Sequence, residues 1–195
     1  RAKVTERFGS VSDQRNIALI AIHQHGIPDR FPSDVIAEAE RAKPAPVKGR
    51  ADFRKVPLIT IDPPDARDHD DAVWAAPDDD PANEGGVKVI VAIADVAHYI
   101  KPGGALDREA RIRGNSVYFP DRVVPMLPER ISNDLCSLKE NEDRPGLACS
   151  MVFDSRGRKR IHKFERVIMR SAASVTYEQA QAAIDGRPDD ATGAI

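Results

Sequence analysis

The chain is organised around the stretch Asp62-Pro63-Pro64-Asp65-Ala66-Arg67-Asp68-His69-Asp70-Asp71, in which five of the ten residues are carboxylates. Short apolar runs typical of β-strands flank it at residues 58–61 and 72–74. Carboxylates held close together repel and raise one another's pKa. A divalent cation relieves that repulsion, because Mg²⁺ prefers carboxylate oxygens and completes its shell with water and substrate phosphate. The stretch therefore indicates a Mg²⁺ or Mn²⁺ site, with phosphoryl chemistry at it.

Three other interpretations of this stretch are weaker. An exposed acidic turn fits Asp78-Asp79-Asp80 better, because no apolar run leads directly into that triplet. A calcium loop of the EF-hand kind needs a Gly at its sharp turn and a closing Glu, and the stretch has neither. Pro63 and Pro64 argue against the strand-Asp-x-Asp signature of an aspartyl-phosphate enzyme. Composition and spacing favour a metal site and leave the substrate open.

Outward from the aspartates, short strand patterns alternate with short helix patterns. The strongest strand covers residues 87–96, with Val87, Val89, Val91 and Ile93 on one face. The other expected strands are 58–61, 72–74, 116–119, 147–153 and 159–169, the expected helices are 33–42, 105–113 and 175–184, and one or two helical turns are expected over 128–133. Hairpins rather than βαβ repeats predict an α+β fold, with a mixed, mainly antiparallel sheet and short helices.

Several helix ends carry clear signals. Pro32 is expected at the first helical position before residue 33, Gly114 at the end of the second helix, and Thr176 as the N-cap of the last. Residues 17–25 are apolar on both faces, so periodicity leaves helix and strand equally open there.

Composition bounds the class of protein. The 195 residues are 41% hydrophobic, which is enough for one modest domain with a core. The net charge of −2, from 29 basic and 31 acidic residues, is not typical of a non-specific nucleic-acid binder. Any RNA path would have to use local basic clusters, such as Arg108, Arg111 and Arg113 or residues 156–160. For each arginine taken singly, a solvated surface position is the better explanation.

The cysteines and the hydropathy pattern indicate a compartment. Cys136 and Cys149 form no close pair, which argues against a disulfide scaffold and a zinc site and favours a reducing environment. No apolar run approaches the length of a membrane span, and no signal peptide opens the chain. We expect a cytoplasmic monomer with no membrane partner.

Residues 61–73 resemble the signature of the ribonuclease II/ribonuclease R family, whose catalytic RNB domain places four aspartates at this spacing. Further blocks that resemble the family follow in order at residues 91–99, 106–110, 113–120, 124–128 and 135–138. The likeness extends from about Phe31 to about Tyr177. The segments Tyr118-Phe119-Pro120 and Asp65-Ala66-Arg67-Asp68 are more similar to bacterial ribonuclease R than to ribonuclease II.

The resemblance implies a processive 3′-to-5′ exoribonuclease that hydrolyses single-stranded or structured RNA to nucleoside 5′-monophosphates with Mg²⁺ or Mn²⁺. The positions that match the family's metal-binding and catalytic aspartates are Asp62, Asp68, Asp70 and Asp71. Asp62 and Asp71 would be the most direct ligands, and Asp68 would complete the cage. Asp70 would be the residue on which turnover depends most, and Asp65 would only form part of the turn.

Tyr118 resembles the family's aromatic residue that stacks on an RNA base near the 3′ end. By spacing alone it is an ordinary half-buried strand residue, and the resemblance reverses that preference. Asp95 and His98, at the end of the strongest strand, are further candidate polar contacts, although a structural role suits each of them at least as well.

The resemblance also predicts a fragment. We expect residues 1–48 to hold the end of a preceding β-domain and a linker helix, and residues 49–195 the N-terminal portion of a truncated RNB catalytic domain. The family's later arginine, glutamate and second stacking aromatic have no match here, so the isolated chain should be weakly active or inactive. The alternatives are a catalytically inactive RNA-binding or interaction module of the same fold and, less well supported, a metal-dependent phosphatase.

Overall fold

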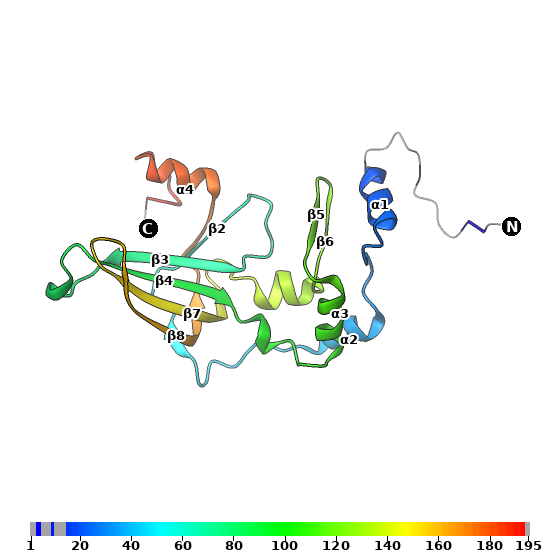
Figure 1. The fold of residues 1–195 in the computed structure, drawn as a ribbon, viewed down its shortest axis with the longest axis horizontal. Coiled ribbons are helices and arrows are strands. Elements are labelled where there is room, and N and C mark those ends of the chain that lie inside the picture. Colours follow the sequence, from blue (N-terminus) through cyan, green and yellow to red (C-terminus); the bar gives the residue numbers. More distant parts are fainter. Residues whose placement is uncertain (1–2, 5–8, 10–14, 194–195) are drawn as a thin grey trace. The chain divides into compact units, whose positions relative to one another are not determined.

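The computed structural model describes residues 3–4, 9 and 15–193 of the chain (Figure 1). They fold into two compact units, and each unit is built from two separate stretches of sequence. The first unit combines Arg1–Ala42 with Ile100–Glu129, and the second combines Lys43–Tyr99 with Arg130–Ile195. No helix among the described residues is both long enough and apolar enough to cross a membrane.

The described residues of the first unit form three helices and a small hairpin. Its elements are α1 (Arg15–Gln24), α2 (Ser33–Arg41), α3 (Ala105–Arg113), β5 (Val117–Phe119) and β6 (Arg122–Val124). α2 packs against α3, and the Glu38 carboxylate of α2 accepts a 2.6 Å hydrogen bond from the backbone N–H of Ala105, the first residue of α3. A carboxylate at that helix end is favoured by the helix dipole. The segment that carries α3 is thereby held to α2, although the two bonded residues are 67 positions apart in sequence.

The second unit is built on a seven-stranded sheet with the order β1-β8-β7-β4-β3-β2-β9 (Figure 1). The strands are β1 (Ala51–Phe53), β2 (Ile59–Asp62), β3 (Asp71–Pro77), β4 (Val87–Ala94), β7 (Asp143–Phe153), β8 (Lys159–Arg170) and β9 (Ala173–Thr176). The four inner pairings are antiparallel, and only the outer pairs β1–β8 and β2–β9 are parallel. The predicted α+β fold with a mixed, mainly antiparallel sheet is confirmed.

Short helical segments complete this unit. They are η1 (Pro81–Asn83), η2 (Val96–His98), the π-helical η3 (Arg130–Cys136) and α4 (Tyr177–Ile184). η2 explains why the strongest strand ends at Ala94 instead of residue 96. η3 extends the few turns expected over 128–133 into a seven-residue segment.

The two faces of the sheet differ in burial. Ala72, Ala92 and Ala148 lie in register across three strands and are almost fully buried. On the opposite face, Ile93 and Leu147 are paired neighbours, yet they are 46% and 44% exposed. The residues of β4 therefore alternate between two faces, and one face is rich in valine as predicted. The core of the unit, however, lies against the other face, which carries the alanines.

Element ends show where sequence signals were incomplete. The helix expected over 175–184 begins at Tyr177, because Val175 and Thr176 belong to β9, a strand that sequence patterns missed. Pro32 is the N-cap of α2 and not its first helical residue. The open choice for residues 17–25 is settled as the helix α1. The expected β-domain end lies largely among residues outside the described ranges, and the division at 48/49 stays a prediction.

Candidate functional site

The aspartate loop, residues 62–71, joins two neighbouring strands of the sheet. Asp62 is the last residue of β2 and is paired with Thr176 of β9. Asp71 is the first residue of β3 and lies opposite Ile93 of β4. Because β2 and β3 are antiparallel, the end of one and the start of the other meet at the same end of the sheet. The backbone carbonyl of Asp70 also accepts a 2.8 Å hydrogen bond from Ala94, so both ends of the loop are fixed by strands.

The middle of the loop folds back on itself, as the prolines suggest. The backbone N–H of Ala66 donates to the carbonyl of Pro63 at 3.0 Å, which closes a turn that contains Asp65. Asp65 is exposed, while Asp68 and Asp62 are partly buried. Asp65 thus lies in a turn, away from the two ends of the loop that belong to strands. This agrees with its expected role as a turn residue.

The carboxylates of the loop share one electrostatic environment. The pKa of Asp70 is raised above its usual value, first by partial burial and then by the negative charges of Asp68, Asp71 and Asp62, in that order. The neighbouring His69 acts in the opposite direction and is the weakest of these influences. Although part of Asp70 reaches solvent, its ionised form is opposed by all three of the other predicted metal ligands.

His69 is a member of the site that sequence patterns did not single out. Its Nδ1 lies 2.7 Å from Oδ2 of Asp62, and each side chain is only 17% exposed. The two residues are seven positions apart, which corresponds to no regular strand or helix contact. Only the fold-back of the loop brings them together, so no sequence signal could have identified the pair.

The donor set suits a hard divalent cation, but the structure does not gather it round one point. Among residues 3–4, 9 and 15–193, no group of three or more His, Cys, Asp or Glu side chains is arranged to hold a metal ion. Carboxylate oxygens are the ligands that Mg²⁺ prefers, and a cation would remove the repulsion that acts on Asp70. The Asp62 carboxylate is engaged with His69 instead. The role of the four aspartates as ligands stays a prediction.

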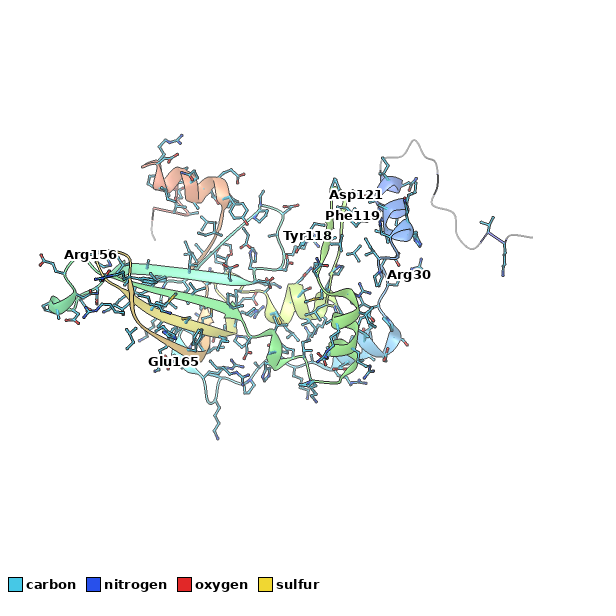
Figure 2. All side chains as sticks on the ribbon, viewed as in Figure 1. Arg30, Tyr118, Phe119, Asp121, Arg156 and Glu165 are labelled. Atoms are coloured by element: carbon cyan, nitrogen blue, oxygen red, sulfur yellow. The ribbon has the colours of Figure 1, made fainter. Side chains whose placement is uncertain are left out.

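The remaining candidate residues fall into two groups. Tyr118 lies on β5 of the first unit, paired with Val123 of β6, and is 66% exposed (Figure 2). Its base-stacking role stays a prediction. Asp95 is buried and pairs with Arg50 at 2.7 Å, which supports a structural role. The ring of His98 packs edge-on against that of Tyr99, with the ring centroids 5.0 Å apart.

The arginines and cysteines also have identifiable environments. The side chain of Arg113 is almost fully buried, donates to Glu109 at 2.8 Å and lies 3.7 Å above the ring of Phe31, so it stabilises the first unit instead of presenting charge.

Cys136 and Cys149 are both free thiols, and burial raises the pKa of Cys136 to about 12. The prediction of unpaired cysteines is confirmed.

Comparisons with known proteins give a consistent result. Residues 50–194 match the RNB domain family. Ribonuclease R of Acidithiobacillus ferrooxidans is 47% identical over 171 residues, covering 86% of this chain and 38% of that protein. Ribonuclease R of Escherichia coli (strain K12) is 42% identical over 191 residues, covering 96% and 23%. The chain thus spans well under half the length of these curated relatives.

One solved structure adds the comparison in three dimensions. Mycoplasma genitalium RNase R in complex with double-stranded RNA superposes with a TM-score of 0.86 at 27% identity, over 95% of this chain and 33% of that one. The likeness covers nearly every element of Figure 1, so the folding of both units, and not only the aspartate loop, is shared with that protein.

Proposed function

This chain belongs to the RNB domain family, and from that premise we propose that it supplies the aspartate-bearing part of a metal-dependent 3′-to-5′ exoribonuclease. The enzyme would hydrolyse RNA processively to nucleoside 5′-monophosphates. The observation that carries the proposal is the aspartate loop, which lies inside the family match and sets the negative charges of three carboxylates against Asp70. The relatives named ribonuclease R support the same activity.

The residues of the loop have distinct parts in this proposal. A bound Mg²⁺ or Mn²⁺ would supply a Lewis acid at the scissile phosphate and an acidified water. Asp62, Asp68, Asp70 and Asp71 would hold the ion, with Asp62 and Asp71 fixed by the strands they belong to. Asp70 would orient the attacking water, and His69 would position the Asp62 carboxylate through its hydrogen bond.

The substrate would be RNA that enters by its 3′ end, either single-stranded or structured. The complex of Mycoplasma genitalium RNase R with double-stranded RNA supports RNA as the partner. Tyr118, exposed on its hairpin, would stack on a base near that end without preference for sequence, because every base has a π-face. We further propose a cytoplasmic, monomeric protein that does not bind membranes.

A chimera tests the activity directly. This chain would replace the matching stretch of Escherichia coli ribonuclease R, which is 42% identical. With Mg²⁺, the chimera should shorten a 5′-labelled RNA progressively from its 3′ end, and the isolated chain should do so weakly or not at all. Asp70→Asn should abolish hydrolysis and leave RNA binding nearly unchanged.

Asp65→Asn is the matched control, because Asp65 is an exposed carboxylate of the same loop that is not among the four predicted ligands. It should retain hydrolysis. If the Asp70→Asn chimera still degrades RNA, the role given to Asp70 is wrong. If the chimera releases inorganic phosphate from the RNA but does not shorten it, the protein is a phosphatase.

A catalytically inactive RNA-binding module of the same fold is the second candidate. It is favoured by one observation, that no three metal-ligating side chains converge among the described residues. In the same assay this candidate predicts that the chimera retains labelled RNA, with and without Mg²⁺, and leaves it uncut.

A further inference from the structure

The aspartate loop has to hold like charges close together. Among its four predicted metal ligands, Asp68 is the one whose backbone is not fixed by a strand. Asp62 ends β2, Asp71 begins β3, and the carbonyl of Asp70 is bound by β4 through Ala94. Asp68 belongs to no strand, yet its charge is the largest electrostatic influence on Asp70. Mutual repulsion would tend to open the loop at this position, and a contact from outside the loop opposes that opening.

Ser137 provides that contact. Its hydroxyl accepts a 3.1 Å hydrogen bond from the backbone N–H of His69 and donates a 2.9 Å hydrogen bond to the backbone carbonyl of Arg67. One side chain thus grips the peptide groups on both sides of Asp68. The next residue, Leu138, donates its backbone N–H to the carbonyl of His69 at 2.8 Å, directly before Asp70.

Ser137 is itself rigidly held. It is fully buried at the end of η3, and its carbonyl accepts a 2.9 Å hydrogen bond from Nε of Arg144. The preceding turn is anchored by Tyr99, whose hydroxyl donates to the carbonyl of Leu135 at 3.4 Å. A serine hydroxyl can donate one hydrogen bond and accept others. The single hydroxyl of Ser137 can therefore satisfy a backbone N–H and a backbone carbonyl at the same time.

We propose that Ser137 is a positioning residue for the aspartate loop. Its hydroxyl fixes the backbone on either side of Asp68, and so keeps the Asp68 and Asp70 carboxylates close enough to bind one cation. This inference rests on the proposed function only in taking a divalent cation as the ligand of the loop. The contacts themselves hold whatever the loop binds.

The test compares Ser137→Ala with Ser171→Ala in the 195-residue chain. Ser171 is the matched control, because it is almost equally buried and its hydroxyl donates to a backbone carbonyl at 2.9 Å, but that carbonyl belongs to Ala173 and not to the aspartate loop. Two quantities are measured, the hydrogen exchange of the His69 amide and the affinity for Mn²⁺ followed by the signal of the free ion. Ser137→Ala should speed exchange at His69 and weaken Mn²⁺ binding about tenfold, the usual effect of removing a supporting contact. Ser171→Ala should change neither.

The outcomes separate this inference from the proposed function. If Ser137→Ala keeps wild-type exchange at His69, or binds Mn²⁺ as tightly as Ser171→Ala does, Ser137 is not a positioning residue. If the wild-type chain binds no Mn²⁺, the proposed metal site fails, and the exchange of His69 still decides the role of Ser137. Should Ser137→Ala fail to fold, Ser137→Thr keeps the hydroxyl, and Ser137→Cys replaces it with a thiol of similar size. Threonine should then preserve protection at His69 and cysteine should lose it, and equal protection in both would overturn the proposal.

Discussion

At the scale of single residues, the site is a set of carboxylates held against their own repulsion. Asp70 bears that repulsion most directly, because Asp68, Asp71 and Asp62 all act on it. Oδ2 of Asp62 lies 2.7 Å from Nδ1 of His69. The arrangement favours binding a cation and is unfavourable to the charged form of Asp70 in its absence. Such tension is typical of functional sites, where pKa values are displaced from their usual range.

The raised pKa of Asp70 predicts a dependence of stability on pH. In metal-free buffer the folded chain keeps the Asp70 proton to a higher pH than the unfolded chain, whose carboxyl titrates near 3.8. The free energy of unfolding therefore falls as the pH rises from about 4 through the native pKa of Asp70. Asp70→Asn removes this loss, so the variant should be more stable than wild type at pH 7 and equally stable at pH 3.

Urea unfolding at the two pH values measures the difference. Asp65→Asn serves as the control, because it removes an exposed carboxylate of the same loop that is not one of the three aspartates whose charges raise the pKa of Asp70. If the Asp70→Asn variant is no more stable than wild type at pH 7, repulsion at Asp70 does not lower the free energy of unfolding.

At the scale of elements, the junction of β9 and α4 supports the start of the aspartate loop. Thr176 is both the last residue of β9, paired with Asp62, and the N-cap of α4. Its hydroxyl accepts from the backbone N–H of Gln179 at 3.2 Å, while the Gln179 side chain accepts from the backbone N–H of Thr176 at 2.9 Å. This capping box fixes the point where the chain turns from strand to helix, directly beside Asp62.

Thr176→Ala should lower the free energy of unfolding by about 0.5–2 kcal/mol, because it leaves the Gln179 amide without its cap. Thr176→Ser keeps the hydroxyl and should lose much less. Thermal unfolding of the three proteins measures the difference. Equal stabilities for alanine and serine would mean that the hydroxyl of Thr176 does not stabilise α4.

At the scale of the whole molecule, the second unit is closed by a buried ion pair between distant segments. Arg50, just before β1, donates to Asp95, just after β4, at 2.7 Å, and their side chains are 5% and 4% exposed. Arg166 of β8 also approaches Asp95 at 3.6 Å. The pair therefore connects the segment before β1 to the end of β4, the central strand, where Ala94 donates to the backbone carbonyl of Asp70.

Asp95→Asn should destabilise the chain by about 3–5 kcal/mol, because it leaves Arg50 buried without a compensating charge. The control is Asp52→Asn, which breaks a largely exposed ion pair with Arg54 and should change the stability far less than Asp95→Asn does. Urea unfolding at pH 7 compares them. Similar losses for both variants would contradict the importance given to the buried pair.

The sequence by itself determined the fold class, most element positions and the identity of the charged loop. Alternating apolar residues, a helix cap at Thr176 and apolar runs on both sides of residues 62–71 are local features, and local patterns suffice for them. The resemblance to the family then reduced the candidate metal ligands in the loop from five aspartates to four. The strands β1, β6 and β9 were missed because three or four residues give no readable period, and none of them stands in a run as apolar as Leu58-Ile59-Thr60-Ile61, from which the equally short β2 was expected.

Only the tertiary structure decided which groups surround those aspartates. It brought His69 against Asp62, Ser137 across the backbone beside Asp68, and Arg50 against Asp95. It also placed the core on the alanine face of the sheet instead of the valine-rich one. Each of these contacts joins residues at irregular or long separations. Their partners are set by the order of strands and the folding back of loops, which no local pattern of the chain encodes.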